Sequence, residues 1–269
     1  GYAQTLVERS HDGCQAMFMQ GCAGDANPFP RGSEEIARLH GASLGEEVLR
    51  VLETELQPIR GPLRALLEPV DMPLAPALSR ADMDAFGKLR GGWRKFVVDQ
   101  MLEKLDRGEP LPTHYTSSIA LWQFGDDLTM VALPGEVVVD YVAFLEKALG
   151  PRKLWVAAYS NDVFGYLPSA KTLAEGGYET RGLYSGGIGL FAPHAQDVVI
   201  DKVQQKLEGL LGSKKLNAKI YGRVKHMVSI YRKLKNQNLM SKSLRPGMML
   251  LDSVRNLTKP TISSRMRTV

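Results

Sequence analysis

The chain lacks any apolar run that approaches the roughly 20 residues a helix needs to cross a bilayer, so the sequence predicts no membrane-spanning helix. It has only two cysteines in 269 residues, Cys14 and Cys22, too few for a disulfide framework or a four-cysteine zinc site. We expect both to be buried free thiols. The five histidines show neither HExxH nor HxH spacing, and no GxSxG segment occurs. A self-contained metal site and a nucleophile elbow are therefore not evident.

What the chain does have is a globular composition, 44% hydrophobic and 23% charged, with its charge divided unevenly. Residues 213–269 hold 14 Lys/Arg and one acid, a net charge of +13, whereas residues 1–212 hold 20 Lys/Arg and 28 acids, a net charge of −8. Such opposed parts indicate two distinct segments. We predict a domain over residues 1–211 (the body) and a basic tail over residues 212–269. The charge of the body gives no reason to expect nucleic-acid binding.

Periodicity in the body predicts helices that alternate with strands. We expect helices over 2–9, 33–57, 79–107, 137–149 and 195–211, and strands over 15–19, 63–70, 118–124, 128–133 and 153–159. Ser33 suits an N-cap, and the turn signal Gly125-Asp126-Asp127 predicts a β-hairpin. The fold class is therefore α/β, or mixed α+β, with a layered sheet core and flanking helices. The charged segment 79–107 is typical of a covering or lid element. The chain opens without an initiator Met, already in a helical pattern, so we expect a piece of a longer protein; its compartment is not indicated.

Three loops, 20–32, 134–136 and 160–168, each leave the end of an expected apolar strand and lead toward a helix. Such strand ends are where ligands usually bind. The polar residues there are Asp25, Asn27, Glu136, Ser160, Asn161, Asp162 and Tyr166, with Tyr178 and Glu179 downstream. Structural interpretations stay open: 24–28 as a simple turn, Glu136 as an acid in a first helical turn, and Tyr166 as a core residue with its hydroxyl at the surface.

The segments AMFMQGCAGDANPFPRG, VALPGEVVVDYVAFLEKAL and VAAYSNDVFGYLPSAKTLAEGGYE, in this order, resemble the N-terminal catalytic domain of neutral/alkaline non-lysosomal ceramidases. The resemblance covers roughly residues 1–211. It implies a zinc-dependent hydrolase that cleaves the N-acyl amide of a small-molecule or lipid-like substrate, with Zn²⁺ polarising the carbonyl. It also implies Glu136 and Tyr166 as zinc ligands, and Tyr178 as a tyrosine near the scissile amide.

This sequence departs from the family pattern in two ways. The two histidine ligands of the family lie upstream of the segment that matches Gly1-Tyr2-Ala3, so we expect this chain by itself to be inactive. Asn27 stands at the position of the serine nucleophile, in the segment that also holds Asp25, and an amide cannot attack a carbonyl as a hydroxyl does. We take Asp25, Asn27 and Tyr178 as candidate catalytic residues. Either a metal-bound water replaces the serine, or the substrate and reaction differ. A catalytically inactive binding scaffold is the alternative.

The tail segment AKIYGRVKHMVSIYRKLKNQNL, residues 218–239, is a basic amphipathic pattern that suits a nucleic-acid or membrane surface. It also resembles the opening of RelA/SpoT-type (p)ppGpp synthetases, in which basic residues meet ATP phosphates. The matched positions are Arg223, Lys225, Ser229 and Lys233. A (p)ppGpp synthetase (GTP pyrophosphokinase) fragment is thus a further alternative. Because the resemblance stops at Leu239, we expect an artificial join or a fusion followed by a frame change, with disorder beyond that residue.

Overall fold

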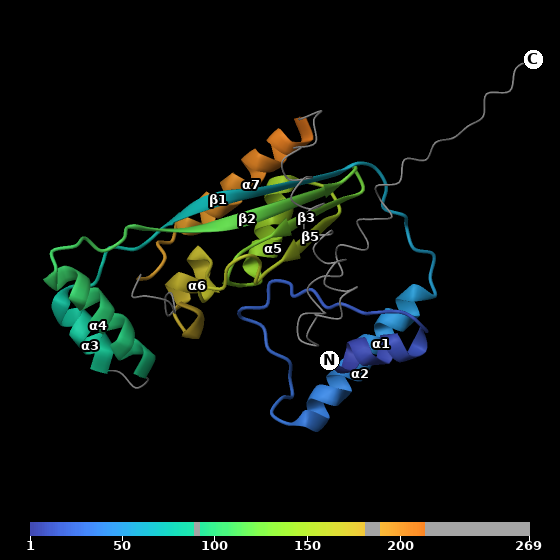
Figure 1. Cartoon of the computed structure of the whole chain (residues 1–269), viewed down its shortest axis with the longest axis horizontal. Helices are drawn as coiled ribbons and strands as arrows, with labels where there is room; N and C mark the ends of the chain where they lie inside the picture. Colours follow the sequence, from blue (N-terminus) through green and yellow to red (C-terminus); the bar gives the residue numbers. More distant parts are fainter. Residues whose placement is uncertain (89–91, 181–188, 213–269) are drawn as a thin grey trace, which may run out of the picture.

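The computed structural model describes residues 1–88, 92–180 and 189–212. Its core is one four-stranded sheet in the order β1-β2-β3-β5, built from β1 (Leu63–Pro73), β2 (His114–Phe124), β3 (Leu128–Ala132) and β5 (Leu154–Ala157). The first three strands form an antiparallel meander, and β5 pairs in parallel with β3. The predicted fold class, a sheet with flanking helices, is confirmed (Figure 1).

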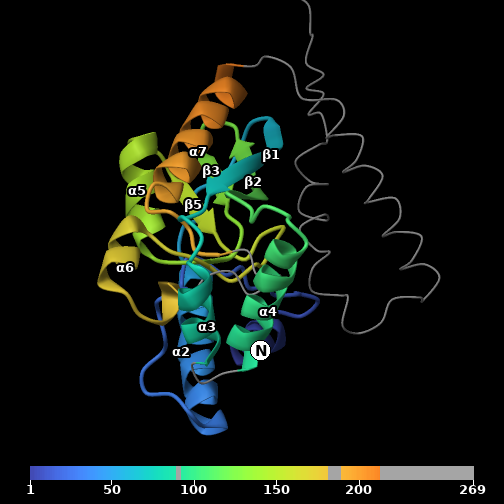
Figure 2. The ribbon, with the colours of Figure 1, turned by 90° about the vertical axis from the view of Figure 1, so that its left-hand side faces the viewer.

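Two helices, α5 and α7, lie on one face of this sheet, and other helices lie beyond it (Figures 1 and 2). Their bounds are α1 (Tyr2–Ser10), α2 (Glu34–Leu52), α3 (Arg80–Lys88), α4 (Gly92–Asp106), α5 (Asp140–Leu149), α6 (Ala170–Glu175) and α7 (Ala195–Gly212), with a 3₁₀ turn, η1, at Tyr178–Thr180. The helices α1 and α2 pack on each other, as do α3 and α4, at two separate places outside the sheet.

One face of the sheet is buried under α5 and α7. Alternate residues of the strands point into this layer, as a half-buried sheet requires: Ile119 and Leu121 from β2 and Val131 from β3 are all fully buried. Tyr141 of α5 and Val203 of α7 pack into the same apolar layer. Period-2 strands and 3.6-period helices therefore meet in one apolar core, which fixes the register of the strands.

Several predicted elements are confirmed. Ser33 caps α2, its Oγ accepting from the Ile36 N–H at 3.2 Å. The hairpin over 118–133 forms as β2 and β3 around the turn at 125–127. The helix predicted over 195–211 is α7.

The strand predicted over residues 15–19 is wrong. Those residues are irregular, and Met17 and Phe18 are exposed. The apolar run does not join the sheet; instead Met19 packs on the second face of the sheet, against a row of alanines, Ala120, Ala132 and Ala157. A β-strand forms only where its backbone is hydrogen-bonded to a neighbouring strand. The chain next to this run makes a backbone hydrogen bond just beyond it, where Ala158 N–H donates to Gln20 O at 2.9 Å.

The helix boundaries also differ from prediction in three places. The helix predicted over 33–57 ends at Leu52, and residues 53–57 are exposed, so no packing keeps them helical. The helical segment 79–107 is two helices, α3 and α4, which pack antiparallel as a hairpin (Figure 2). The helix expected from Val137 begins at Asp140, because Glu136 and Val137 form a short strand, β4. Glu136 is therefore not the first-turn acid of a helix; Asp140 has that place.

Both cysteines are free, as expected, but only Cys22 is buried. Cys14 lies at the surface after α1. Among the described residues, no helix is both long and apolar enough to cross a bilayer.

Candidate functional site

The short strand β4 (Glu136–Val137) places Glu136 beside Tyr166, the other predicted zinc ligand. It pairs in parallel with β6 (Tyr166–Leu167), with Glu136 directly opposite Tyr166. This two-residue pairing lies beyond the ends of β3 and β5, at the same edge of the sheet. Residues thirty positions apart in the sequence thus become neighbours at a strand end, where ligands usually bind.

The backbone around Glu136 is held on both sides. Its N–H donates to Gly165 O at 2.7 Å, and the preceding Gly135 N–H donates to Asp162 O at 2.8 Å. Gly135 has φ +74, and a Cβ there would come within 2.8 Å of Gly165 O and the Phe164 ring. Only glycine meets both requirements, a left-handed conformation and a close backbone approach. The loop therefore presents Glu136 from a rigid frame.

Glu136 is surrounded by phenols. Burial, the Glu136 charge and a side-chain hydrogen bond with Glu136 raise the pKa of Tyr166 to about 12. The Tyr178 ring lies edge-on to the Tyr166 ring, with centroids 5.6 Å apart. At neutral pH the Tyr166 hydroxyl therefore keeps its proton, and the site offers carboxyl groups beside phenolic hydrogen-bond donors.

The structure adds Tyr159 to the site, a residue that sequence reasoning missed. Its hydroxyl lies 3.4 Å from Glu136 Oε2, a long hydrogen bond. Burial, followed by the charge and the hydrogen bond of Glu136, raises the pKa of Tyr159. Tyr159 also has φ +52, which a non-glycine residue rarely adopts. A tyrosine at the end of an apolar strand is typical of a core position, and neither its backbone conformation nor its carboxylate partner has a signal in the sequence.

Asp162 anchors the loop that carries these tyrosines. Its Oδ2 accepts hydrogen bonds from Tyr115 Oη and Ser117 Oγ of β2, both at 2.9 Å. Its backbone oxygen accepts a hydrogen bond from Gly135 N–H. Asp162 therefore connects the loop after β5 both to strand β2 and to the loop after β3. Asp162 therefore positions the other groups of the site.

The first predicted loop does reach this site, through the backbone of Gly24 and the side chain of Asp25. Gly24 N–H donates to Val137 O at 2.8 Å, and Asp25 Oδ1 accepts from Val139 N–H at 2.8 Å at the start of α5. Asp25 thus has a structural partner, three residues from Glu136. Asn27 is exposed, and its Oδ1 accepts from Arg31 Nη1 at 2.6 Å within the same loop.

The donors for a metal are incomplete. Glu136 and Tyr166, the two predicted ligands, would supply two oxygen atoms, whereas a zinc site takes three or four protein ligands. In residues 1–88, 92–180 and 189–212, no group of three or more His, Cys, Asp or Glu side chains could hold a metal ion. The described residues therefore do not fit a complete zinc site.

The nucleotide-binding alternative cannot be placed in the structure. Arg223, Lys225, Ser229 and Lys233 all lie outside the described residues.

Comparison with solved structures finds ceramidases. Neutral ceramidase from Pseudomonas aeruginosa is similar at a TM-score of 0.49 and 19% identity, over 76% of this chain and 39% of that one. A structure described as "Ceramidase complexed with C2" is similar at a TM-score of 0.49 and 17% identity, over 76% of this chain and 40% of that one. The chain thus spans about two fifths of the length of either protein. No protein-family model matches the sequence, and no curated protein matches it.

Proposed function

We propose that this chain is part of a hydrolase that cleaves the N-acyl amide bond of a lipid-like substrate. The observation that carries the proposal is the β4–β6 pairing, which sets Glu136 opposite Tyr166 at a strand end. The three segments that resemble ceramidases contain this pair, and the first of them contacts β4 through Gly24.

The proposed roles follow from the chemistry of the side chains. Hydrolysis adds water across the C–N bond of the amide and leaves a carboxylic acid and an amine. The Glu136 carboxylate is an anionic group of the site, able to hold a proton or a cation. The phenols of Tyr166 and Tyr178 are donors that suit a carbonyl oxygen as negative charge develops on it. Tyr159 and Asp162 hold these groups in place.

In this proposal the hydrolysis requires zinc. Its remaining ligands would come from outside the described residues, and imidazoles suit a zinc ion that already has oxygen ligands. Asn27 does not supply a nucleophile, so in this proposal water attacks the amide carbon directly.

The experiment measures fatty-acid release from an N-acylated amino alcohol by the full-length protein, with zinc content determined on the same sample. Glu136→Gln should reduce turnover on the order of a hundredfold or more, the size of effect expected for a group that handles a proton in the transition state. It should also lower the bound zinc. Glu46→Gln, on the exposed surface of α2, is the matched control and should change neither quantity.

Two results would contradict the proposal. Full activity in Glu136→Gln would remove the β4–β6 site from the chemistry. No release from any N-acyl substrate by a folded, zinc-loaded protein would favour the alternative, a catalytically inactive scaffold in which Asn27 replaces the nucleophile.

A further inference from the structure

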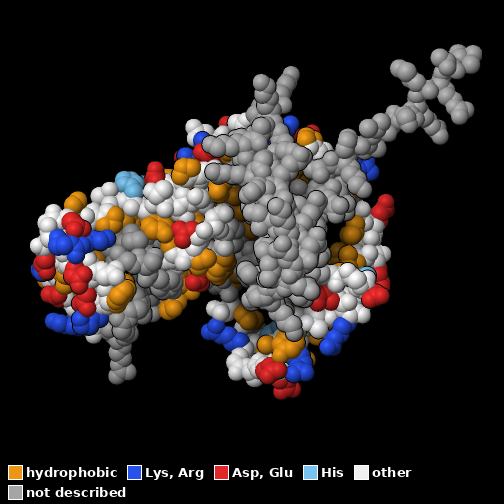
Figure 3. Space-filling view, in the orientation of Figure 1, with side chains coloured by type: hydrophobic (Ala, Val, Ile, Leu, Met, Phe, Trp, Pro, Cys, Tyr) orange, Lys and Arg blue, Asp and Glu red, His pale blue; other side chains and the backbone are white. Residues whose placement is uncertain are grey.

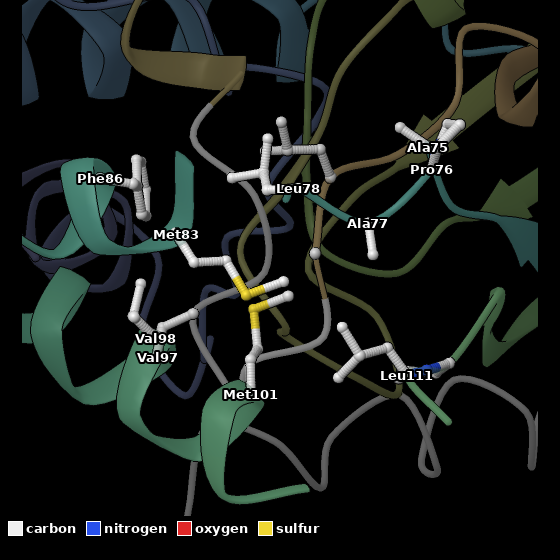
Figure 4. A pocket seen from close by; sticks show the side chains of 13 residues that line it. Ala75, Pro76, Ala77, Leu78, Met83, Phe86, Val97, Val98, Met101 and Leu111 are labelled. Atoms are coloured by element: carbon white, nitrogen blue, oxygen red, sulfur yellow. The ribbon is translucent and has the colours of Figure 1, made fainter. Parts of the chain in front are cut away.

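An apolar cavity of about 220 Å³ lies between the α3–α4 hairpin and the rest of the body (Figure 4). The hairpin supplies one wall, from residues such as Met83, Phe86 and Met101. The other wall comes from the chain segments that leave β1 and enter β2, including Leu78 and Leu111. In Figure 4 the side chains of Met83 and Met101 point toward each other at the cavity, with Ala77 and Leu111 facing them.

The described lining has no polar side chain. All thirteen residues are Ala, Pro, Gly, Leu, Val, Met or Phe. Two backbone N–H groups near the cavity are also paired: Ala75 N–H donates to Leu190 O at 2.8 Å, and Leu74 N–H donates to Thr113 O at 2.8 Å. A water molecule needs two to four polar partners, so this cavity offers water little. Apolar cavities of about 150 Å³ stay dry and bind small apolar molecules.

The outside of the hairpin is quite different. Lysines, arginines and acids alternate over it (Figure 3), and ion pairs such as Lys95–Asp99 join them. Charge on the outer surface keeps the hairpin soluble, while its inner side has Val97, Val98 and Met101 buried. The apolar side is therefore directed to the cavity.

The walls suit a flexible chain better than a rigid ring. Methionine is unbranched and polarisable, so Met83 and Met101 adapt to different shapes. The hairpin and the sheet have separate hydrophobic cores, so the two walls are not held by one rigid packing. Ala77 and Leu78 at the edge are exposed, which gives a ligand access from solvent.

We propose that the cavity between the α3–α4 hairpin and the rest of the body binds the hydrocarbon chain of an amphiphile, whose polar group stays at the exposed edge near Ala77. The inference goes beyond the proposed hydrolysis, because binding here requires no cleavage and no residue of the Glu136 site.

The test is calorimetric titration of the chain with a series of n-alkanols from hexanol to decanol. Burial of each further methylene should tighten binding about fourfold until the cavity is filled. Ala77→Phe fills the cavity from an exposed position without removing a core contact, and it should abolish binding. Met101→Gln keeps the length of the side chain but adds an unpaired amide, and it should weaken binding at least tenfold.

Phe96→Gln is the matched control, because Phe96 is a large exposed apolar residue on α4 that does not line the cavity. It should leave the affinities unchanged, and thermal unfolding should show that each variant is folded. Absence of binding, affinity independent of chain length, or unchanged binding in folded Ala77→Phe would overturn the proposal. Since none of these measurements involves turnover, their failure is separate from failure of the hydrolase proposal.

Discussion

Single residues shape the site mainly through backbone contacts. Gly24 lies against β4 so closely that a Cβ there would come within 2.6 Å of Glu136 O and 3.0 Å of Val137 O. Its N–H bond to Val137 O requires this approach. The glycine therefore matters because the strand that carries Glu136 passes directly over it.

Gly24→Ala should destabilise the protein by about 1–3 kcal/mol, as expected for a group forced into a packed space. Gly21→Ala is the control in the same loop, because its Cβ would meet Val156 O at an ordinary 3.7 Å. Urea unfolding of the two variants measures the difference. Equal stabilities would mean that loop 20–32 does not pack on β4 as described.

Glu136 also determines how its neighbours ionise. Removing its charge by Glu136→Gln should lower the pKa of Tyr166 from about 12, while the contribution of burial persists. The sign follows because a nearby carboxylate disfavours the phenolate. NMR titration of ¹³Cζ-labelled tyrosine measures the shift, with Glu46→Gln as the control. A Tyr166 pKa that stays the same in Glu136→Gln would show that the two side chains do not interact.

At the scale of elements, short connections join strands to helices by side-chain caps. Ser169 precedes α6, is fully buried, and its Oγ accepts from Thr172 N–H at 3.0 Å. The same hydroxyl donates to Asp140 Oδ2, 2.7 Å away in the first turn of α5. One hydroxyl therefore links the element after Tyr166 to the element after Glu136.

Ser169→Ala should cost more than an ordinary cap. Loss of a helix cap costs about 1 kcal/mol, and a buried polar group left without its partner costs roughly 1–3 kcal/mol. Ser33→Ala, which removes the exposed cap of α2, is the comparison. Urea unfolding should show that Ser33→Ala is the more stable variant and Ser169→Ala the less stable one. The reverse order would contradict the link between α5 and α6.

At the scale of the whole molecule, the α3–α4 hairpin is an insertion between two paired strands. Pro73 at the end of β1 is opposite His114 at the start of β2. Facing residues of an antiparallel pair lie about 5 Å apart. The hairpin also has its own small core, separate from that under the sheet. The sheet therefore does not need the hairpin to close.

Replacing residues 78–111 by a short glycine-containing turn should leave the body folded. Circular dichroism should show less helix, and thermal unfolding should stay cooperative. The shortened protein should not bind alkanols, because one wall of the cavity is gone. Loss of cooperative unfolding would show that the hairpin supports the sheet. The lid function predicted for this segment stays a prediction.

Much of the fold could be predicted because its signals are local. Ser33 with two following acids specifies the start of α2, and the apolar alternation around 125–127 specifies the β2–β3 hairpin. The strand predicted over residues 15–19 is wrong because a short apolar run has the same sequence pattern whether it pairs with a sheet or packs across its face. The strand β4 has no signal in the sequence because it has only two residues, too few for any periodicity, so the predicted helix begins too early, at Val137.

The sequence by itself determined most of the helices and strands, the opposed charges of body and tail, and the residue types at three strand-end loops. The tertiary structure decided which of them meet. Glu136 and Tyr166 become neighbours because β3 and β5 run parallel, which brings both loops to one edge of the sheet. Tyr159 joins them because its backbone turns left-handed there, whereas Asp25 is held at the start of α5. Such contacts depend on hydrogen bonds between distant segments, and no local pattern encodes them.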